Sequence, residues 1–300
     1  MSFIKTKHHK PYPAILPSRP ELSQRDQTVL ITGGGSGIGY AISKAFAQAG
    51  AATIVIVGRR LDVLRDATVK LKQDVPEFAG RVLGLKCNVS DLQSTADLWD
   101  ALQSENIVVD VLVLNAADSR SSGPLHQIDL QQIWAEFNAN VRGPIDIAQR
   151  FLKQNDAMPN GHKKTIVNIS TLCIYDFATP GTKPNYNLMK NAGTLAMQQI
   201  ARDVPGEKTQ IVSFHPGGVF TEASKAAGFT VDMWDWDDEM LPGSFAVWAA
   251  SAEASFLHGR YVEANWDVEE MSRGDVRTKV EQDQYFLQIG VNGLVGTRTA

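Results

Sequence analysis

The chain has 300 residues, 43% of them hydrophobic, and a formal net charge of −4 at pH 7. This length and composition allow a full hydrophobic core, and without a basic block nucleic acid is not an expected partner. No apolar run approaches the roughly 18 residues of a membrane-spanning helix, and no apolar stretch follows the basic N-terminus, so we expect neither a membrane anchor nor a secretory signal. Cys87 and Cys173 lie far apart and form no disulfide framework, which favours a reducing cytoplasm.

The first 27 residues are rich in proline and lack periodicity, so we predict an extended arm that lies on the body or is loose. Strand and helix patterns alternate after this arm. Continuous β-branched runs such as 53–57 predict strands covered on both faces, and apolar residues spaced as in 38–49 predict amphipathic helices. The predicted strands are 28–32, 53–57, 82–87, 110–114, 165–169, 209–214 and 260–263, and the predicted helices are 38–49, 61–73, 91–104, 130–151, 185–204 and 243–257.

This alternation predicts an α/β fold, a doubly wound parallel sheet of about seven strands with helices on both faces and right-handed crossovers. The sequence shows no internal repeat and no linker, so we expect one domain with two tails. The expected boundaries are an N-terminal arm at 1–27, the domain at 28–267 and a C-terminal tail at 268–300. Residues 222–242 form an irregular segment within the domain.

A glycine-rich loop follows the first predicted strand and opens the first predicted helix. It reads Thr-Gly-Gly-Gly-Ser-Gly-Ile-Gly over residues 32–39. Glycines in this context let the backbone turn tightly and approach a dinucleotide pyrophosphate, whose charge then faces amide N–H groups and the helix dipole. The alternative is a glycine-rich turn without a ligand. The order of strand, loop and helix favours the cofactor site.

The end of the second strand, Val57-Gly58-Arg59-Arg60, bears on which dinucleotide is bound. A site for NAD(H) usually has an acidic residue here that binds the ribose hydroxyls, and none is present. Arg59 can instead form charge-assisted bonds to a 2′-phosphate, so NADP(H) is favoured over NAD(H). The alternative is that both arginines are solvated surface residues. Within the glycine loop only Ser36 offers a side chain to a phosphate.

Tyr186 and Lys190 are four residues apart in a predicted helix and therefore share one face. A free phenol has a pKa of about 10, and a nearby ammonium lowers that pKa, which would make Tyr186 a usable proton donor near neutral pH. Ser170 follows the fifth strand, at the edge where open α/β sheets bind ligands, and its hydroxyl can orient a carbonyl. Asn140 lies inside a predicted helix, where asparagine is disfavoured. It can cap a local break and hold a water near Lys190, or it is a surface residue.

These residues occur in the order found in the short-chain dehydrogenase/reductase superfamily, of the type with a single Rossmann domain. The chain resembles that superfamily from about residue 28 to residue 266. The N-terminal arm and the segment 259–267 also resemble a fungal branch, several members of which act in secondary metabolism. The shared motifs are the loop at 32–39, Asn115-Ala116-Ala117, Asn140-Val-x-Gly143, Ser170, Tyr186-x-x-x-Lys190 and the segment 216–221.

The resemblance implies a role for each matching residue. Tyr186 would be the general acid in reduction and the general base in oxidation, and Lys190 would lower its pKa and bind the nicotinamide ribose. Ser170 would place the carbonyl, and Asn140 would hold a water that passes protons to Lys190. The implied cofactor-binding residues are Gly33, Gly35, Ser36, Gly37, Ile38, Gly39, Arg59, Asn88, Val89, Asn115, Ala116, Tyr186, Lys190, Pro216, Gly217, Val219 and Thr221. No metal is expected, and the resemblance implies a homodimer or homotetramer built through the helices that carry Asn140 and Tyr186.

Several features depart from the family pattern. Asn88 stands where the family usually has Asp, and the motif after the fourth strand ends in alanine rather than glycine. Asp118, the next residue, adds a carboxylate near the mouth of the site. The interval from Ser170 to Tyr186 is sixteen residues, longer than the family norm. Part of the segment 175–184 is therefore expected to bulge and to reshape the substrate pocket.

The segment 222–242 occupies the position of a mobile lid in the family. Its aromatic residues can line a site for a bulky, hydrophobic or ring-bearing carbonyl compound. Alternatively, they pack the lid onto the core. The large apolar residues of this segment are Phe229, Met233, Trp234, Trp236, Met240 and Leu241.

Taken together, these features predict an NADP(H)-dependent ketoreductase or alcohol dehydrogenase that acts on a small-molecule carbonyl or alcohol. Two alternatives stay open. The same site can run non-redox or internal-redox chemistry, such as dehydration or epimerisation, or the chain is a cofactor-sensing binding protein.

Overall fold

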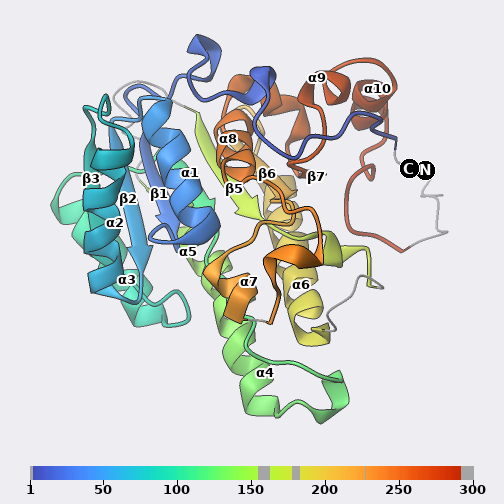
Figure 1. Ribbon diagram of the computed structural model, residues 1–300, viewed down its shortest axis with the longest axis horizontal. Helices are drawn as coiled ribbons and strands as arrows, with labels where there is room; N and C mark the ends of the chain where they lie inside the picture. Colours follow the sequence, from blue (N-terminus) through green and yellow to red (C-terminus); the bar gives the residue numbers. More distant parts are fainter. Residues whose placement is uncertain (1–2, 155–162, 178–182, 227, 292–300) are drawn as a thin grey trace.

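Seven parallel strands form one central sheet in the computed structural model, which describes residues 3–154, 163–177, 183–226 and 228–291 (Figure 1). The strand order is β3-β2-β1-β4-β5-β6-β7, and every neighbouring pair is parallel, as predicted. The strands are β1 (Thr28–Thr32), β2 (Thr53–Gly58), β3 (Arg81–Lys86), β4 (Val111–Leu114), β5 (Lys164–Ile169), β6 (Thr209–His215) and β7 (Arg260–Glu263).

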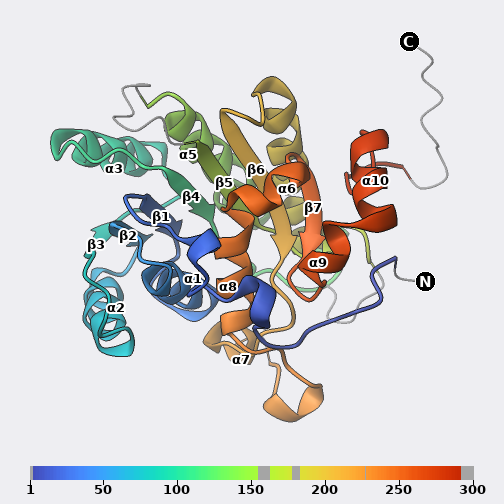
Figure 2. The same cartoon turned by 90° about the horizontal axis from the view of Figure 1, so that it is seen from above.

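Helices cover both faces of the sheet. Figures 1 and 2 place α1, α2 and α8 on one face and α3, α5 and α6 on the other. The helices that pack on the sheet are α1 (Gly37–Gln48), α2 (Leu61–Asp74), α3 (Leu92–Ser104), α5 (Gly143–Leu152), α6 (Pro184–Asp203) and α8 (Met240–Ala249). The shorter ones are α4 (Leu130–Phe137), α7 (Glu222–Ala226), α9 (Val268–Met271) and α10 (Gly274–Gln282).

Each face of the sheet has its own hydrophobic core, because alternate strand residues point to opposite faces. In β1, Val29 and Ile31 are buried in the core that α1 and α8 cover, whereas Leu30 is buried in the core that α3, α5 and α6 cover. Full burial of one such side chain contributes roughly 1.5–3 kcal/mol. The two cores hold the sheet as a fixed platform for the loops at its edge.

The chain changes direction across the sheet between β1 and β4, which are neighbours in space but not in sequence. From β1 the chain builds outward through β2 to β3, and from β4 it builds the other way to β7. Such a switch point leaves a crevice at the carboxyl ends of the strands. The glycine loop follows β1 and Asn115 follows β4, so both lie at this crevice.

The N-terminal arm lies on the body of the protein. The buried hydroxyl of Tyr12 donates to the carbonyl oxygen of Trp266 over 3.0 Å and accepts from the backbone N–H of Val268 over 2.8 Å. Both partners follow β7, so the arm is fixed to the C-terminal part of the sheet. Its two short 3-10 helices are η1 (Pro13–Ile15) and η2 (Pro20–Leu22).

All seven strands agree with their predicted bounds to within one residue at each end. The predicted helix 130–151 is confirmed as α4 and α5, which a π turn, η4 (Asn138–Arg142), joins without a gap. The predicted helix 243–257 is divided, into α8 and the 3-10 helix η7 (Ala252–Leu257), where the Ser251 side chain caps the second segment. No element was assigned to the tail from the sequence, and the structure places α9 and α10 in it.

Candidate active site

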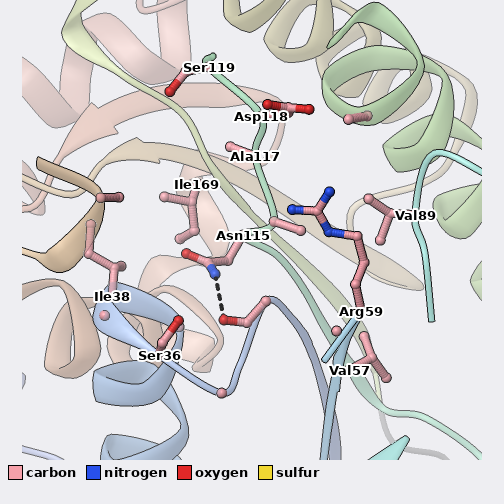
Figure 3. Close-up of a pocket in the computed structure, with 18 of the residues that line it drawn as sticks. Ser36, Ile38, Val57, Arg59, Val89, Asn115, Ala117, Asp118, Ser119 and Ile169 are labelled. Carbon is pink, nitrogen blue, oxygen red and sulfur yellow. Dashed lines mark hydrogen bonds between the residues drawn. The ribbon is translucent and has the colours of Figure 1, made fainter. Parts of the chain in front are cut away.

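A cavity of about 450 Å³ lies at the crevice, enclosed by the glycine loop, the end of β2, the segment after β4 and one face of α6 (Figure 3). Most of the residues predicted from the sequence line it. They are Gly33, Gly35, Ser36, Gly37, Ile38, Gly39, Arg59, Asn88, Val89, Asn115, Ala116, Ser170, Tyr186, Lys190, Pro216 and Thr221. Of the predicted residues in the described part of the chain, Asn140, Gly217 and Val219 do not line it.

The glycine loop has the geometry that a pyrophosphate needs. Gly33 and Gly37 have positive φ angles of 68° and 52°, which favour glycine. A Cβ on Gly39 would lie 2.2 Å from the carbonyl oxygen of Gly33, so a side chain there would prevent the loop from closing on α1. Ser36 is the N-cap of α1, and within the described residues its side chain makes no capping bond. The first N–H groups of α1 are therefore available to an anionic ligand.

Asn115 joins the ends of β1 and β4 beside this loop. Its amide nitrogen donates to the carbonyl oxygen of Thr32 over 2.9 Å, and the Thr32 hydroxyl accepts from the backbone N–H groups of Asn115 and Ala116 over 2.9 and 3.0 Å. Figure 3 shows the Asn115 amide directed toward the loop. These bonds set the width of the crevice at the point where the chain changes direction.

Arg59 extends from the end of β2 into the cavity, and its guanidinium lies between Asn115 and Val89 in the view of Figure 3. The side chain is exposed, and no ion pair of Arg59 occurs among the described residues. Asn88, at the end of β3, accepts from the backbone N–H of Ser90 over 3.2 Å. The cation at this end of the cavity is therefore available to an anionic group.

Tyr186 and Lys190 both line the cavity from α6, as their spacing predicts. The Lys190 ammonium donates to the carbonyl oxygen of Ile169 at the end of β5, and burial lowers its pKa to about 8. Burial raises the pKa of the Tyr186 phenol. The nearby Cys173 raises this pKa further, and a hydrogen bond with the Thr171 side chain opposes the rise.

The predicted lowering of the Tyr186 pKa by Lys190 is therefore not seen in this structure. Burial disfavours the charged form of each group, which raises the pKa of the phenol and lowers the pKa of the ammonium. Among the described residues, Lys190 is not a cause of the Tyr186 shift. The phenol is therefore harder to ionise than a free tyrosine.

Ser170 directly follows β5, and its hydroxyl lies 2.6 Å from the hydroxyl of Thr194 on α6, with either able to donate. The sequence interpretation missed Thr194. It stands four residues after Lys190 and eight after Tyr186, so all three share one helical face. This spacing along the helix is the sequence feature that could have identified Thr194.

Asn140 uses its amide to hold the segment that follows β4. Its amide nitrogen donates to the carbonyl oxygens of Asp118 and Glu136 over 2.6 and 2.9 Å, and its amide oxygen accepts from the backbone N–H of Asp118 over 3.1 Å. The predicted role of Asn140 in holding a water near Lys190 stays a prediction. The Asp118 carboxylate lines the cavity as expected, and it pairs with Arg120 over 2.7 Å.

Glu136 of α4 is fully buried, and the sequence interpretation passed over it. Its carboxylate accepts from the backbone N–H of Ser121 over 2.6 Å, from the Ser121 hydroxyl over 2.7 Å and from the Asn185 amide over 2.9 Å. Asn185 directly precedes Tyr186 in the first turn of α6. Glu136 therefore ties the segment after β4 to the helix that carries Tyr186.

The turn after β6, residues 216–221, is held from outside the cavity by Asp237. The Asp237 carboxylate accepts from the backbone N–H of Gly218 over 2.7 Å, and the backbone N–H of Asp237 donates to the carbonyl oxygen of Gly218 over 2.8 Å. His9 of the N-terminal arm bonds the same carboxylate over 2.7 Å. The arm thus reaches the wall of the candidate site.

Aromatic residues of the lid pack against one another and against Phe220 of the preceding turn, with tilted rings. Ring centroids lie 4.6 Å apart for Trp234 and Trp236, 5.2 Å apart for Phe229 and Trp234, and 5.1 Å apart for Phe220 and Trp236. In the described part of the chain these four do not line the cavity, whereas Glu222 of α7 does. They pack against one another beside this cavity, and their role in lining a substrate site stays a prediction.

The long interval between Ser170 and Tyr186 falls partly outside the described residues, which omit 178–182. In its described part, the Tyr175 hydroxyl donates to the carboxylate of Glu263 at the end of β7. Ser170 and Tyr186 line the same cavity in spite of the longer interval.

Among the described residues, no group of three or more His, Cys, Asp or Glu side chains is placed to hold a metal ion. No helix in the same part of the chain is both long and apolar enough to cross a membrane.

Comparisons with known proteins agree with this geometry. A protein-family model for short chain dehydrogenases matches residues 27–230. The chain is 37% identical over 269 residues to the short chain dehydrogenase/reductase nsrO of Aspergillus novofumigatus, with 88% of each chain covered. It is similar in fold to the Pseudomonas aeruginosa RhlG/NADP active-site complex, with a TM-score of 0.71 at 19% identity, covering 82% of this chain and 97% of that one.

A second solved structure of similar fold is a 7α-hydroxysteroid dehydrogenase complexed with NADH and 7-oxo glycochenodeoxycholic acid. Its TM-score is 0.69 at 20% identity, and the match covers 85% of this chain and 97% of that one. The family match over most of the chain and the curated relative carry the assignment, and the two structures support the fold. The chain therefore belongs to the short-chain dehydrogenase/reductase superfamily, a family of oxidoreductases that use a nicotinamide cofactor.

Proposed function

We propose that the protein is an NADP(H)-dependent ketoreductase or alcohol dehydrogenase with Tyr186 as the general acid and base. The observation that carries the proposal is one cavity that brings together Ser170, Tyr186 and Lys190 with the glycine loop. The loop and the first turn of α1 would hold the pyrophosphate. The remaining face of the cavity would then receive a carbonyl compound.

When bound, a nicotinamide supplies hydride to a carbonyl carbon or takes it from an alcohol. In the direction of reduction, the Tyr186 phenol gives its proton to the carbonyl oxygen as that oxygen gains negative charge. Burial keeps this phenol protonated, and the oxygen that forms is a stronger base than a phenolate. The proton transfer is therefore favourable in spite of the raised pKa.

Lys190 and Asn140 complete the proposal. Lys190, with a pKa of about 8, exchanges protons near neutral pH and can restore the proton of Tyr186. Asn140 holds the backbone of Asp118 at the cavity wall. The side-chain amide of Asn140 therefore acts on the shape of the site. The backbone carbonyl oxygen of Asn140 lies against Gly193 of α6.

The preference for NADP(H) over NAD(H) is proposed from Arg59. Its guanidinium extends into the cavity at the end of β2, where an acidic residue would otherwise bind the ribose hydroxyls. RhlG is described with NADP and the 7α-hydroxysteroid dehydrogenase with NADH, so the shared fold accepts either. The choice depends on the residues of this chain.

For the substrate we propose a bulky, hydrophobic or ring-bearing carbonyl compound of secondary metabolism. The sequence resemblance to a fungal branch supports the metabolic setting, and the nsrO relative is also from a fungus, Aspergillus. The aromatic cluster of the lid lies next to the turn 216–221 and supplies an apolar surface there.

We further propose one domain over residues 28–267 and a homodimer or homotetramer formed through the helical segment that carries Asn140, which begins with α4, and through α6, which carries Tyr186. Large apolar side chains are exposed on both helices, which supports this assembly. They are Leu130 and Trp134 on α4, and Leu188 and Leu195 on α6.

The experiment is Tyr186→Phe, assayed as NADPH oxidation with a panel of aromatic ketones. We expect turnover to fall by roughly 100- to 10,000-fold, because a general acid contributes that much. NADPH affinity measured by fluorescence titration should stay near the wild-type value. Tyr40→Phe is the matched control, because the Tyr40 hydroxyl bonds Asp74 over 3.1 Å outside the cavity.

Full turnover by Tyr186→Phe would contradict the assignment of the proton donor. Conversion of a substrate without net NADPH consumption would instead identify the dehydratase or epimerase alternative. Tight NADPH binding with no turnover of any ketone would favour the cofactor-sensing alternative.

A further inference from the structure

The hydroxyls of Ser170 and Thr194 are buried together at the base of the candidate site. The two residues are 2% and 1% exposed, and their oxygens lie 2.6 Å apart. Within the described part of the chain, neither hydroxyl has another hydrogen-bond partner. Because buried polar groups are normally paired, each hydroxyl depends on the other.

The direction of this hydrogen bond decides what Ser170 can do. A hydroxyl has one proton and can accept at its lone pairs. If Ser170 donates to Thr194, a substrate carbonyl in the cavity meets only the lone pairs of Ser170. If Thr194 donates to Ser170, the Ser170 proton is free to point into the cavity that this residue lines. Only the second arrangement lets Ser170 donate to a carbonyl.

The position of Thr194 is fixed by the packing of α6. A Cβ on Gly193 would lie 2.8 Å from the carbonyl oxygen of Asn140, so the helix lies directly against η4 at this point. Tyr186, Lys190 and Thr194 occupy successive turns of the same helical face. One face of α6 therefore carries the proton donor, the buried ammonium and the partner of Ser170.

We propose that Thr194 is a positioning residue: its hydroxyl donates to Ser170 and thereby commits the Ser170 proton to the substrate carbonyl. This inference rests on the proposed carbonyl reduction. A chain of two hydrogen bonds polarises both hydroxyls in the same direction. The carbonyl oxygen gains negative charge in the transition state, so the Ser170 bond is stronger there than in the ground state. Loss of Thr194 should lower kcat more than it raises KM.

The first experiment compares Thr194→Val with Thr194→Ser, using NADPH and the aromatic ketone that the wild-type protein reduces fastest. Thr194→Val keeps the branched shape and removes the hydroxyl, so we expect kcat to fall about tenfold, as for one lost hydrogen bond. Thr194→Ser keeps the hydroxyl and should recover most of kcat. Thr194→Ala replaces Thr194→Val if the valine variant does not fold.

A matched control separates a role in the reaction from a role in stability. Thr95 is a fully buried threonine on α3, and its hydroxyl bonds Asp146 on α5, outside the cavity. Thr95→Val should lower the urea midpoint as Thr194→Val does, but leave kcat and KM at the wild-type values.

The deciding experiment is a double-mutant cycle with Ser170→Ala. If Thr194 acts through Ser170, Thr194→Val has no further effect on kcat once Ser170→Ala is present. Wild-type kcat in Thr194→Val, or the same tenfold loss in both backgrounds, would overturn the inference and leave the proposed function standing. Wild-type kcat in Ser170→Ala would instead remove Ser170 from the proposed function. A wild-type protein that reduces no ketone of the panel would overturn both.

Discussion

Arg59 is the residue on which the proposed preference for NADP(H) rests. It is exposed at the end of β2, its side chain reaches into the cavity, and the described residues hold no ion-pair partner for it. A guanidinium in this setting can bind a 2′-phosphate through two parallel hydrogen bonds. NADH has a neutral 2′-hydroxyl in place of the phosphate, so the guanidinium of Arg59 has no charged partner there.

Arg59→Ala is therefore expected to weaken NADPH binding by roughly 10- to 100-fold, because a hydrogen bond to a charged group contributes about 1.5–3 kcal/mol. NADH binding should change little. Both dissociation constants are measured by fluorescence titration. Arg65→Ala on α2 is the control, because Arg65 is exposed but does not line the cavity in the described part of the chain. Equal weakening of NADPH and NADH would exclude the 2′-phosphate role.

Among the elements, α4 and the π turn η4 form hydrogen bonds to other parts of the site that their sequence pattern does not predict. Successive turns of this segment present Glu136 and Asn140, which bond the segment after β4 at Ser121 and Asp118. Glu136 also bonds Asn185 in the first turn of α6. The wall of the cavity and the helix that carries Tyr186 are thus joined through one buried carboxylate.

This arrangement predicts a compensating pair of substitutions. Glu136→Gln replaces a carboxylate oxygen by an amide N–H group, which then faces other hydrogen-bond donors. Asn185→Asp places a second carboxylate beside Glu136. Each single variant should lose about 1–3 kcal/mol of unfolding free energy, because buried groups are left unpaired. In the double variant the pair again consists of one amide donor and one carboxylate acceptor. It should therefore recover more than half of the unfolding free energy that the two single variants lose in total. Urea unfolding measures all four proteins.

Additive losses in the double variant would show that Glu136 and Asn185 do not act as a pair. Turnover should follow the same order as stability in this set, because the carboxylate holds the turn that precedes Tyr186.

At the scale of the whole molecule, the N-terminal arm and the C-terminal tail enclose one end of the sheet. Backbone groups of Lys5 and Thr6 donate to the Glu270 carboxylate over 2.9 and 3.0 Å, and Phe3 packs against Trp266 and Phe286. Exposed apolar side chains remain on α4 and α6. These two helices are where the proposed assembly would form.

The wild-type protein is expected to be a dimer or tetramer in solution, and Trp134→Lys to shift it toward the monomer. Trp134 is 56% exposed, and a charge at the centre of an apolar interface is strongly unfavourable. Light scattering after size exclusion measures the mass. Val69→Lys is the control, because Val69 is 58% exposed on α2, away from α4 and α6. A wild-type mass equal to one chain would contradict the proposal.

The sequence by itself determined the fold and the parts of the candidate site that are built from local patterns. Strand and helix periodicity predicted all seven strands, because that signal depends on near neighbours, and their alternation with helices predicted that they run parallel. The glycine loop and the pair Tyr186 and Lys190 were found because their spacing fixes their geometry within one turn or one helical face.

Only the tertiary structure decided how these parts act on one another. Ser170 and Thr194 are 24 residues apart, Glu136 and Asn185 are 49 apart, and His9 and Asp237 are 228 apart, so no local pattern reveals these bonds. The direction of the Tyr186 pKa is a second case. Spacing predicted a lowered pKa from the adjacent cation, whereas burial, which depends on the whole fold, raises it.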